Sequence, residues 1–250
     1  MSAVLEVKSL SKTYRQGQAV TFQVKDISFK VEAGQVMGFI GRNGAGKTTT
    51  LKAILNLIRP EAGQVLIFGK DFLEAEDEIK QETGYAVGGM SYYKRKRIKD
   101  IAEVTKTFYD NWDDQAYRHY LKGFKLDENK RLMDLSEGMK VKFYLTMALS
   151  HQAKLLILDE PSSGLDPVSR DEMAEIFKKL AAKGVAILFS THITSDLDKC
   201  ADAITYIKDG KIVASMDKQD FIEHFANEMA TTSPSLEDIM VYIEHEEVDI

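Results

Sequence analysis

The chain has 250 residues, of which 44% are hydrophobic and 29% are charged, as expected for one globular domain or one domain with subdomains. The net charge of −6 excludes a domain that is basic overall, as a general nucleic-acid binder would be. The single cysteine, Cys200, excludes an intrachain disulfide framework, and we expect neither a signal peptide nor a membrane span.

The first seventy residues are expected to form mainly strands. Apolar and polar side chains alternate over 4–8 and 27–31, which is typical of half-buried antiparallel strands. Residues 35–40 are more continuously apolar, as in a buried parallel strand. A helix is predicted from about Lys47 to Leu57, since a proline follows shortly after.

The middle of the chain has a different pattern. Ile101, Val104, Phe108 and Trp112 follow helical spacing, and no strand pattern appears again before residue 155. This pattern predicts a helical subdomain that is inserted between two strands of the main sheet.

The last third returns to strands that alternate with helices. Buried strands are predicted at 155–158 and 186–190, a hairpin at 204–215 with its turn at Asp209 and Gly210, and a capping box at 235–238. This alternation predicts an α/β fold with a parallel core sheet. We expect one domain over 1–250, divided into an antiparallel β subdomain (1–35 and 61–75), a catalytic core (36–60 and 151–215), a helical subdomain (88–150) and a helical tail (216–250).

A phosphate-binding loop is predicted at 41–48, "GRNGAGKT", directly after a buried strand and directly before a helix. Its glycines allow a tight turn whose amides face phosphate oxygens. Lys47 would reach the β- and γ-phosphates, and the Thr48 hydroxyl would face Mg²⁺. The predicted nucleotide contacts of this segment are Gly41, Asn43, Gly44, Ala45, Gly46, Lys47, Thr48 and Thr49.

Two adjacent carboxylates follow the strand "LLIL", at the strand end where α/β folds bind ligands. Asp159 is predicted to hold Mg²⁺, and Glu160 to activate or orient the attacking water. His192 follows the next buried strand and would contact the γ-phosphate or that water. Together these residue types indicate nucleotide hydrolysis.

A second anion site is indicated by "LSEGMKVKF" at 135–143, where a Ser-Glu-Gly corner precedes a helical run. The free amides at such a helix start attract anions. The alternative is an ordinary helix N-cap made by Ser136.

The motifs "GRNGAGKT", "LSEGM", "LLILDEP", "SSGLDP" and "STH" stand here in the order and spacing of the ATP-binding cassette family, and the chain resembles that family over residues ~3–215. The resemblance implies a P-loop NTPase fold, the cofactors ATP and Mg²⁺, and ATP hydrolysis in a transporter subunit. It implies two partners, a second ATPase subunit and a transmembrane permease, and a cytoplasmic place on the inner face of the membrane, with no nucleic acid.

The resemblance also implies roles for four further residues. Ser136 and Gly138 would cap the γ-phosphate of ATP held by the partner subunit. Tyr14 matches the aromatic residue that stacks on adenine, and Asp166 matches the aspartate that couples the two sites across the dimer.

Two positions depart from the family pattern. Gly88 stands where the family usually has a glutamine that contacts Mg²⁺, and Gln81 lies too early to replace it. Met139 stands at the usual last glutamine of the signature. The chain is similar to ATPases of Gram-positive ABC-2-type peptide or antimicrobial exporters, including the phenol-soluble-modulin exporter group. This narrower resemblance is carried by the Gly88-Gly89 variant and by the segments "LSEGMK" and "FYDNWDD".

The segment 92–99, "YYKRKRIK", is a dense basic run in an acidic chain. It can be simply a solvated helix start. Alternatively, Lys94, Arg95, Lys96 and Arg97 would face acidic groups of a permease or anionic lipid headgroups.

Other ATPases of the family act in DNA repair or translation without transport. The repair type carries a long coiled coil, for which the 88 residues between Lys47 and Ser136 leave no room, and the translation type normally has two cassettes per chain. A P-loop kinase would leave Ser136, Asp166 and His192 without an explanation. We therefore expect an exporter ATPase.

Overall fold

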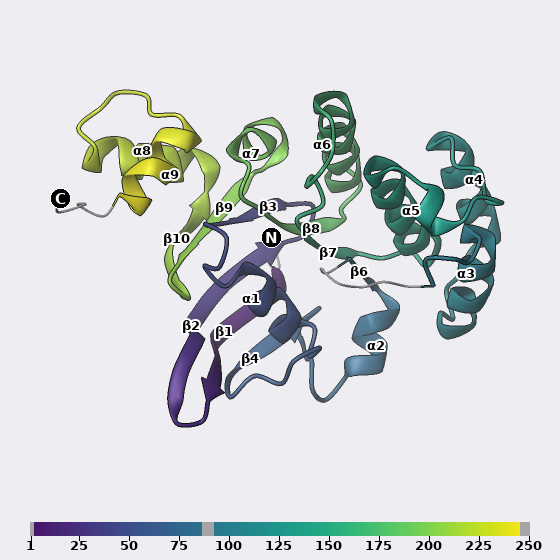
Figure 1. Cartoon of the computed structure of the whole chain (residues 1–250), viewed down its shortest axis with the longest axis horizontal. Coiled ribbons are helices and arrows are strands. Elements are labelled where there is room, and N and C mark those ends of the chain that lie inside the picture. The colour runs from purple at the N-terminus through teal and green to yellow at the C-terminus, as the bar shows by residue number, and fades with distance from the viewer. Residues whose placement is uncertain (1–2, 87–92, 246–250) are drawn as a thin grey trace.

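A computed structural model describes residues 3–86 and 93–245 of the chain. Within these ranges the core is a six-stranded sheet in the order β10-β9-β3-β8-β7-β6 (Figure 1). Its strands are β3 (Val36–Ile40), β6 (Thr83–Ala86), β7 (Leu155–Asp159), β8 (Ala186–Thr191), β9 (Ala203–Lys208) and β10 (Lys211–Asp217). The predicted parallel core is confirmed for five neighbouring strands, and the sixth, β10, pairs antiparallel with β9 at one edge.

The predicted antiparallel β subdomain is a second sheet in the order β2-β1-β4-β5. It contains β1 (Ala3–Gln16), β2 (Ala19–Glu32), β4 (Ala62–Ile67) and β5 (Lys70–Asp71). Leu5 of β1 lies opposite Val31 of β2 and opposite Ile67 of β4, and all three are buried. The alternation of the sequence thus turns one face of this sheet toward the core.

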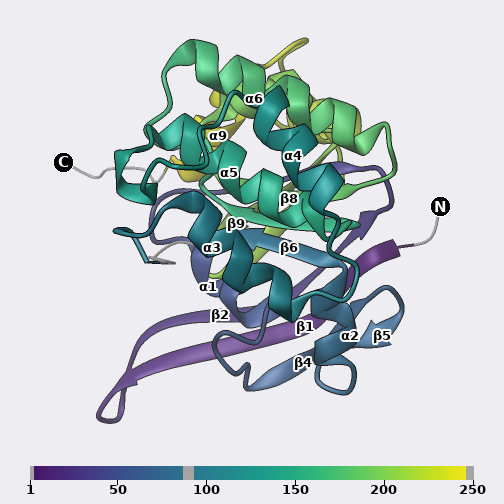
Figure 2. The same cartoon turned by 90° about the vertical axis from the view of Figure 1, so that its right-hand side faces the viewer.

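Helices cover both faces of the core sheet. On one face, α1 (Lys47–Ile54) packs between the core sheet and the antiparallel sheet. On the other lie α6 (Pro167–Ala181), α7 (Thr194–Cys200) and part of α5 (Glu137–Ser150). Figure 2 shows these layers, with the antiparallel sheet beyond α1 and with α5 and α6 on the opposite side. The short helix α2 (Glu76–Gln81) precedes β6.

The inserted helical subdomain consists of α3 (Ile98–Thr105), α4 (Asp114–Gly123), most of α5 and the 3₁₀ turns Lys106–Phe108 and Leu132–Asp134. The helical spacing of Ile101, Val104, Phe108 and Trp112 indicated this helical insertion, but the four residues do not share one helix. After Phe108 the chain becomes extended at Tyr109, and Val104 and Phe108 are exposed rather than buried.

The C-terminal tail forms α8 (Lys218–Glu228) and α9 (Leu236–Glu244), at the opposite end of the molecule from α3 and α4 (Figure 1). The predicted capping box is confirmed: Ser235 accepts from the amide of Asp238, and the Asp238 carboxylate accepts from the amide of Ser235. Leu236 and Ile239 bury the inner face of α9.

Candidate nucleotide-binding site

The loop 41–46 connects β3 to α1 and has the backbone that its glycines permit. Gly46, the residue before α1, has φ 115°, and a β-carbon there would lie 2.7 Å from a methyl group of Val24. Only glycine fits this position without displacing a neighbour. Gly41, Ala45 and Gly46 are buried, whereas Asn43 and Gly44 are exposed on the outer side of the loop.

The turn between β9 and β10 fastens the loop in place. Asp209 and Gly210 both have positive φ, 48° and 72°, as a two-residue hairpin turn requires. The amide of Gly210 donates to the Ala45 carbonyl at 2.9 Å, and the Gly210 carbonyl accepts from the amide of Lys25 at 2.8 Å. The sequence predicted this turn, but nothing in its motif indicated that it touches the phosphate loop.

Lys47 is the centre of the site and is 5% exposed. Its ammonium donates to the carbonyls of Gly41 at 2.8 Å and Arg42 at 3.2 Å, and lies 3.2 Å from Oε1 of Glu160. The other oxygen of Glu160 lies 2.8 Å from Nδ1 of His192. The structure therefore brings Lys47, Glu160 and His192 into one continuous polar chain.

Asp159 lies beside this chain. One of its oxygens accepts from the Thr48 hydroxyl at 2.8 Å, and the other from the Ser190 hydroxyl at 2.6 Å. The Ser190 oxygen in turn accepts from the amide of Glu160 at 3.0 Å. Glu160 has φ 49°, an unfavourable backbone for this residue type that these bonds help to hold.

These side chains meet because β3, β7 and β8 are parallel neighbours whose carboxyl ends lie at one edge. A hydroxyl and a carboxylate at hydrogen-bond distance, Thr48 and Asp159, are the oxygen donors that Mg²⁺ prefers, with water completing its shell. The residues present thus fit a magnesium ion.

The Ser-Glu-Gly corner is the start of α5. Ser136 is exposed, and its hydroxyl oxygen accepts from the amide of Met139 at 3.3 Å, so the N-cap reading is correct for the isolated chain. Within the described residues no hydrogen bond or ion pair joins the Ser136 or Gly138 side of α5 to Lys47, Thr48 or His192. The role of the corner toward a partner's nucleotide stays a prediction.

Asp166 lies next to this corner. It caps α6 by accepting from the amides of Val168 and Ser169, both at 3.0 Å, and a β-carbon on Gly138 would lie 3.3 Å from the Ser169 hydroxyl. The loop that leaves Glu160 therefore ends beside the start of α5, and both segments are exposed there.

Other predicted contacts lie at the border of the site. Tyr14, on β1, is 37% exposed, with its ring 6.4 Å from that of Phe22 and 5.9 Å from the Lys12 ammonium. Thr49 is half-buried at the start of α1. Their roles toward nucleotide stay predictions.

The two departures from the family pattern have different outcomes. Gly88 lies outside the described residues. Gln81 ends α2 and uses its amide to join the core to the helical subdomain, donating to the Phe108 carbonyl at 2.8 Å and accepting from the amide of Asp110 at 2.9 Å. Met139 packs partly buried against the apolar cluster of the helical subdomain.

A contact that the sequence did not indicate brings the C-terminal helix to the phosphate loop. Glu244 accepts from the Tyr206 hydroxyl at 2.9 Å and lies 3.9 Å from the Arg42 guanidinium, and Lys208 donates to the Ile243 carbonyl at 2.7 Å. Burial, together with the bond to Glu244, raises the pKa of Tyr206 above its ordinary value. The end of α9 is thus attached to β9 beside the loop.

The comparisons with known proteins agree with this geometry. Residues 24–163 match the protein family described as ABC transporter. The chain belongs to the ABC transporter ATP-binding family. It is an ABC-type ATPase with the P-loop fold of that family. Its relatives include "Bacitracin transport ATP-binding protein BcrA" of Bacillus licheniformis, 33% identical over 218 residues, which cover 85% of this chain and 69% of that protein. "ABC transporter ATP-binding protein YtrB" of Bacillus subtilis is 26% identical over 89% of this chain and 75% of that protein.

Solved structures share the fold. "Structure of ATP binding subunit of ABC transporter" superposes with a TM-score of 0.83 at 27% identity and covers 97% of this chain and 100% of that chain. A nucleotide-free ATP-binding cassette from an ABC transporter superposes with a TM-score of 0.75 at 19% identity, over 98% of this chain and 100% of that chain, a likeness of fold alone. Within the described ranges, no helix combines the length and apolar character that a membrane crossing requires.

Proposed function

We propose that this ABC ATPase binds and hydrolyses ATP to drive a separate transmembrane permease that exports peptides or antimicrobial compounds. The observation that carries the hydrolytic part is the chain of contacts from Lys47 through Glu160 to His192, beside the Thr48–Asp159 pair. The export part is supported by relatives named for bacitracin transport.

The residues of the site divide the chemistry between them. The amides of 41–48 and the Lys47 ammonium would bind the β- and γ-phosphates. Thr48 and Asp159 would hold Mg²⁺, which would neutralise phosphate charge. Glu160 accepts a proton from the attacking water while the water oxygen bonds to the γ-phosphorus. The bond between the γ-phosphorus and the β–γ bridging oxygen breaks, and ADP leaves. His192, 2.8 Å from Glu160, holds that carboxylate in position.

A second copy of this chain, or a paralogue, would complete each site. Ser136 is exposed and Gly138 half-buried beside Asp166, so this corner can approach a nucleotide bound to another subunit. In that arrangement ATP is held between a lysine loop and a helix start, and it favours the closed dimer because it binds that state better. Tyr14 would stack on adenine.

The permease would dock on a groove between the core and the helical subdomain. The groove has a volume of about 930 Å³ and runs between α2, β6, α3 and α5. Val104 and Phe108, on its α3 side, are 54% and 70% exposed, and together they offer apolar surface for a partner to cover. A cytoplasmic segment of the permease is the proposed occupant, and it would keep the ATPase on the inner face of the membrane.

Hydrolysis is tested with the purified chain and Glu160→Gln. We expect the wild type to release phosphate from MgATP, and the variant to bind ATP but hydrolyse it about 10³-fold more slowly, because it lacks the base. Glu175→Gln, an exposed change on α6, is the matched control and should keep the wild-type rate. Equal phosphate release by Glu160→Gln and the wild type would contradict the assignment of the base.

A further inference from the structure

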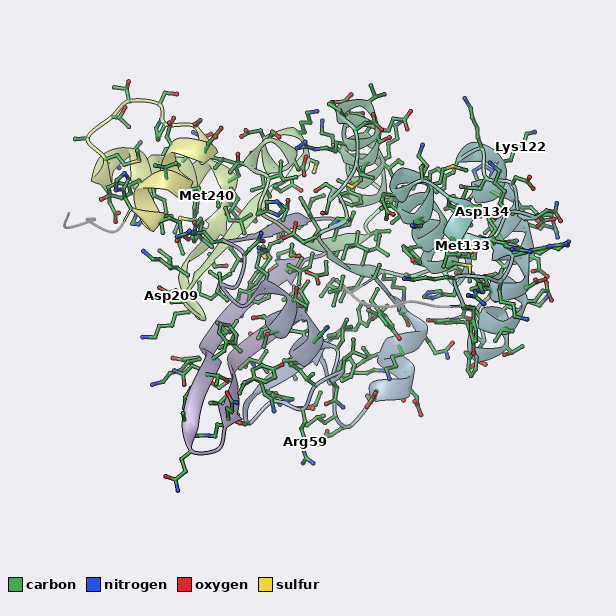
Figure 3. All side chains as sticks on the ribbon, viewed as in Figure 1. Arg59, Lys122, Met133, Asp134, Asp209 and Met240 are labelled. Carbon is green, nitrogen blue, oxygen red and sulfur yellow. The ribbon has the colours of Figure 1, made fainter. Side chains whose placement is uncertain are left out.

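Two basic segments that are distant in the sequence lie side by side on the helical subdomain. The amide of Leu132 donates to the Lys96 carbonyl at 3.0 Å, and that of Met133 to the Lys94 carbonyl at 2.9 Å. Arg97 and Arg131 form an antiparallel bridge. We call residues 93–97 and 130–133 together the basic arm. Met133 is labelled in Figure 3, at the end of the molecule away from α8 and α9.

The arm concentrates positive charge in a chain whose net charge is −6. In the part of the chain that the structure describes, no ion pair includes any of its cations. The nearby carboxylate of Asp127 accepts from the amide of Asn129 and feels the charge of Lys130 without pairing with it. The cations are all exposed: Lys94, Arg95, Lys96, Arg97, Lys130 and Arg131.

The bridge between Arg97 and Arg131 is unfavourable by itself. Residues directly opposite each other in an antiparallel pair have side chains on the same face, and like charges there repel. An anion between the two guanidinium groups would remove this repulsion, and a phosphate group matches their planar arrangement of donors.

Two exposed apolar side chains accompany the cations. Tyr93 is 65% exposed and Met133 is 53% exposed. Cations combined with an exposed aromatic side chain are typical of surfaces that lie at the headgroup level of a membrane.

We propose that the basic arm binds the anionic headgroups of the membrane beside the permease. The inference rests on the proposed function, which brings the ATPase to a permease: Tyr93 and Lys96 also line the groove assigned to the permease segment, so the arm borders that segment. Long exposed cations without fixed acceptors fit a fluid layer of phosphates better than one carboxylate of fixed position. Nucleic acid is disfavoured by the acidic remainder of the chain.

The test measures binding of the whole chain, without permease or ATP, to vesicles of phosphatidylcholine with and without about one third phosphatidylserine. We expect binding to the anionic vesicles only, and weaker binding as salt rises. The arm variant changes Lys94, Arg97, Lys130 and Arg131 to Gln. Since each cation near an anionic surface contributes about fivefold, binding should fall at least 20-fold.

The control variant removes the same charge elsewhere, by changing Lys25, Arg59, Arg118 and Lys179 to Gln. These residues are exposed and lie far apart in the chain, so binding should change less than about threefold. The proposal would be overturned by equal losses in both variants or by absence of binding to anionic vesicles. It would also be overturned by binding to poly-glutamate or single-stranded DNA but not to vesicles.

A milder pair of variants keeps the test valid if the fourfold arm variant does not fold. Arg131→Gln alone should weaken vesicle binding about fivefold, and Arg118→Gln alone should not. The ATPase rate in solution, measured on the same samples, should be unchanged in both. Absence of ATP hydrolysis by the wild type would contradict the proposed function. The vesicle result would still show whether the basic arm binds anionic headgroups.

Discussion

The phosphate loop and the start of α5 are both predicted sites for anions, but the chain holds them in opposite ways. The loop is interlocked: Gly210 bonds to Ala45, and Lys47 contacts Glu160 from a different strand end. The start of α5 is exposed, and the Ser136 hydroxyl bonds only to the amide of Met139 in its own helix.

Because of this difference, we expect substitutions at the two places to affect stability and activity in different ways. At the interlocked loop, a substitution breaks contacts between distant parts of the chain, so stability and activity should fall together. At the exposed corner, the chain loses little when a side chain changes, and a loss of activity there must come from what the corner meets outside its own subunit. The four predictions that follow test this contrast.

The largest effect is expected for Gly210→Ala. A β-carbon there would lie 1.9 Å from the Gln23 carbonyl oxygen, at φ 72°, so the turn would have to leave the phosphate loop. The free energy of unfolding, measured by urea denaturation, should fall by about 3 kcal/mol or more, and ATP affinity should fall with it. Gly184→Ala, also at positive φ but with open space around it, is the control and should cost about 1 kcal/mol.

Ser190→Ala tests the part of the nucleotide site around Asp159 and Glu160. It removes the hydroxyl that donates to Asp159 and accepts from the amide of Glu160, and Ser190 is fully buried. Loss of these bonds should cost about 2 kcal/mol of unfolding free energy and reduce hydrolysis. Ser233→Ala, exposed between α8 and α9, should change neither quantity. Wild-type stability in Ser190→Ala would show that these bonds are dispensable.

Ser136→Gly tests the exposed corner. Because glycine is also accepted at a helix N-cap, unfolding free energy should fall by only a few tenths of a kcal/mol. Hydrolysis should fall about tenfold, the factor of one charge-assisted hydrogen bond to phosphate. Mixed with Lys47→Ala, the variant should regain activity in dimers that keep one intact composite site. If mixing restores nothing, the corner does not act on a partner's nucleotide.

The smallest effect concerns Asp166 and pH. Hydrogen bonds, first from the Ser169 hydroxyl and then from backbone amides, hold the pKa of Asp166 below its ordinary value. A carboxylate with a lowered pKa in the folded state stabilises the fold above its unfolded pKa of about 4, and this contribution disappears as pH falls further. The urea midpoints of the wild type and Asp166→Asn should therefore differ near neutral pH and converge in acid. In a Ser169→Ala background the two should differ less at every pH.

Local sequence was sufficient for much of the fold and of the nucleotide site. The strand–loop–helix at 36–54 was predictable because a buried apolar run, a glycine loop and a helix follow one another directly. Asp159 and His192 were predictable because parallel strands align their ends. Helical spacing indicated the helical subdomain but not where its helices end: Phe108 lies in a 3₁₀ turn and Tyr109 is extended.

What the sequence did not reveal are contacts between segments that are far apart in the chain. The turn at Gly210 against Ala45 and the pairing of Arg97 with Arg131 depend on how whole elements pack. Asp209 and Gly210 predict a turn, but they do not indicate which other segment the turn contacts. The same holds for Ser190, whose hydroxyl becomes important only when β7 and β8 lie side by side.

The hydrogen bond from Tyr206 to Glu244 joins the C-terminal helix to the strand that borders the nucleotide site. A protein shortened before Glu244 would leave a buried phenol without an acceptor, one residue along β9 from the backbone that borders the loop. We therefore expect a chain that lacks the last turn of α9 to lose stability beside the phosphate loop.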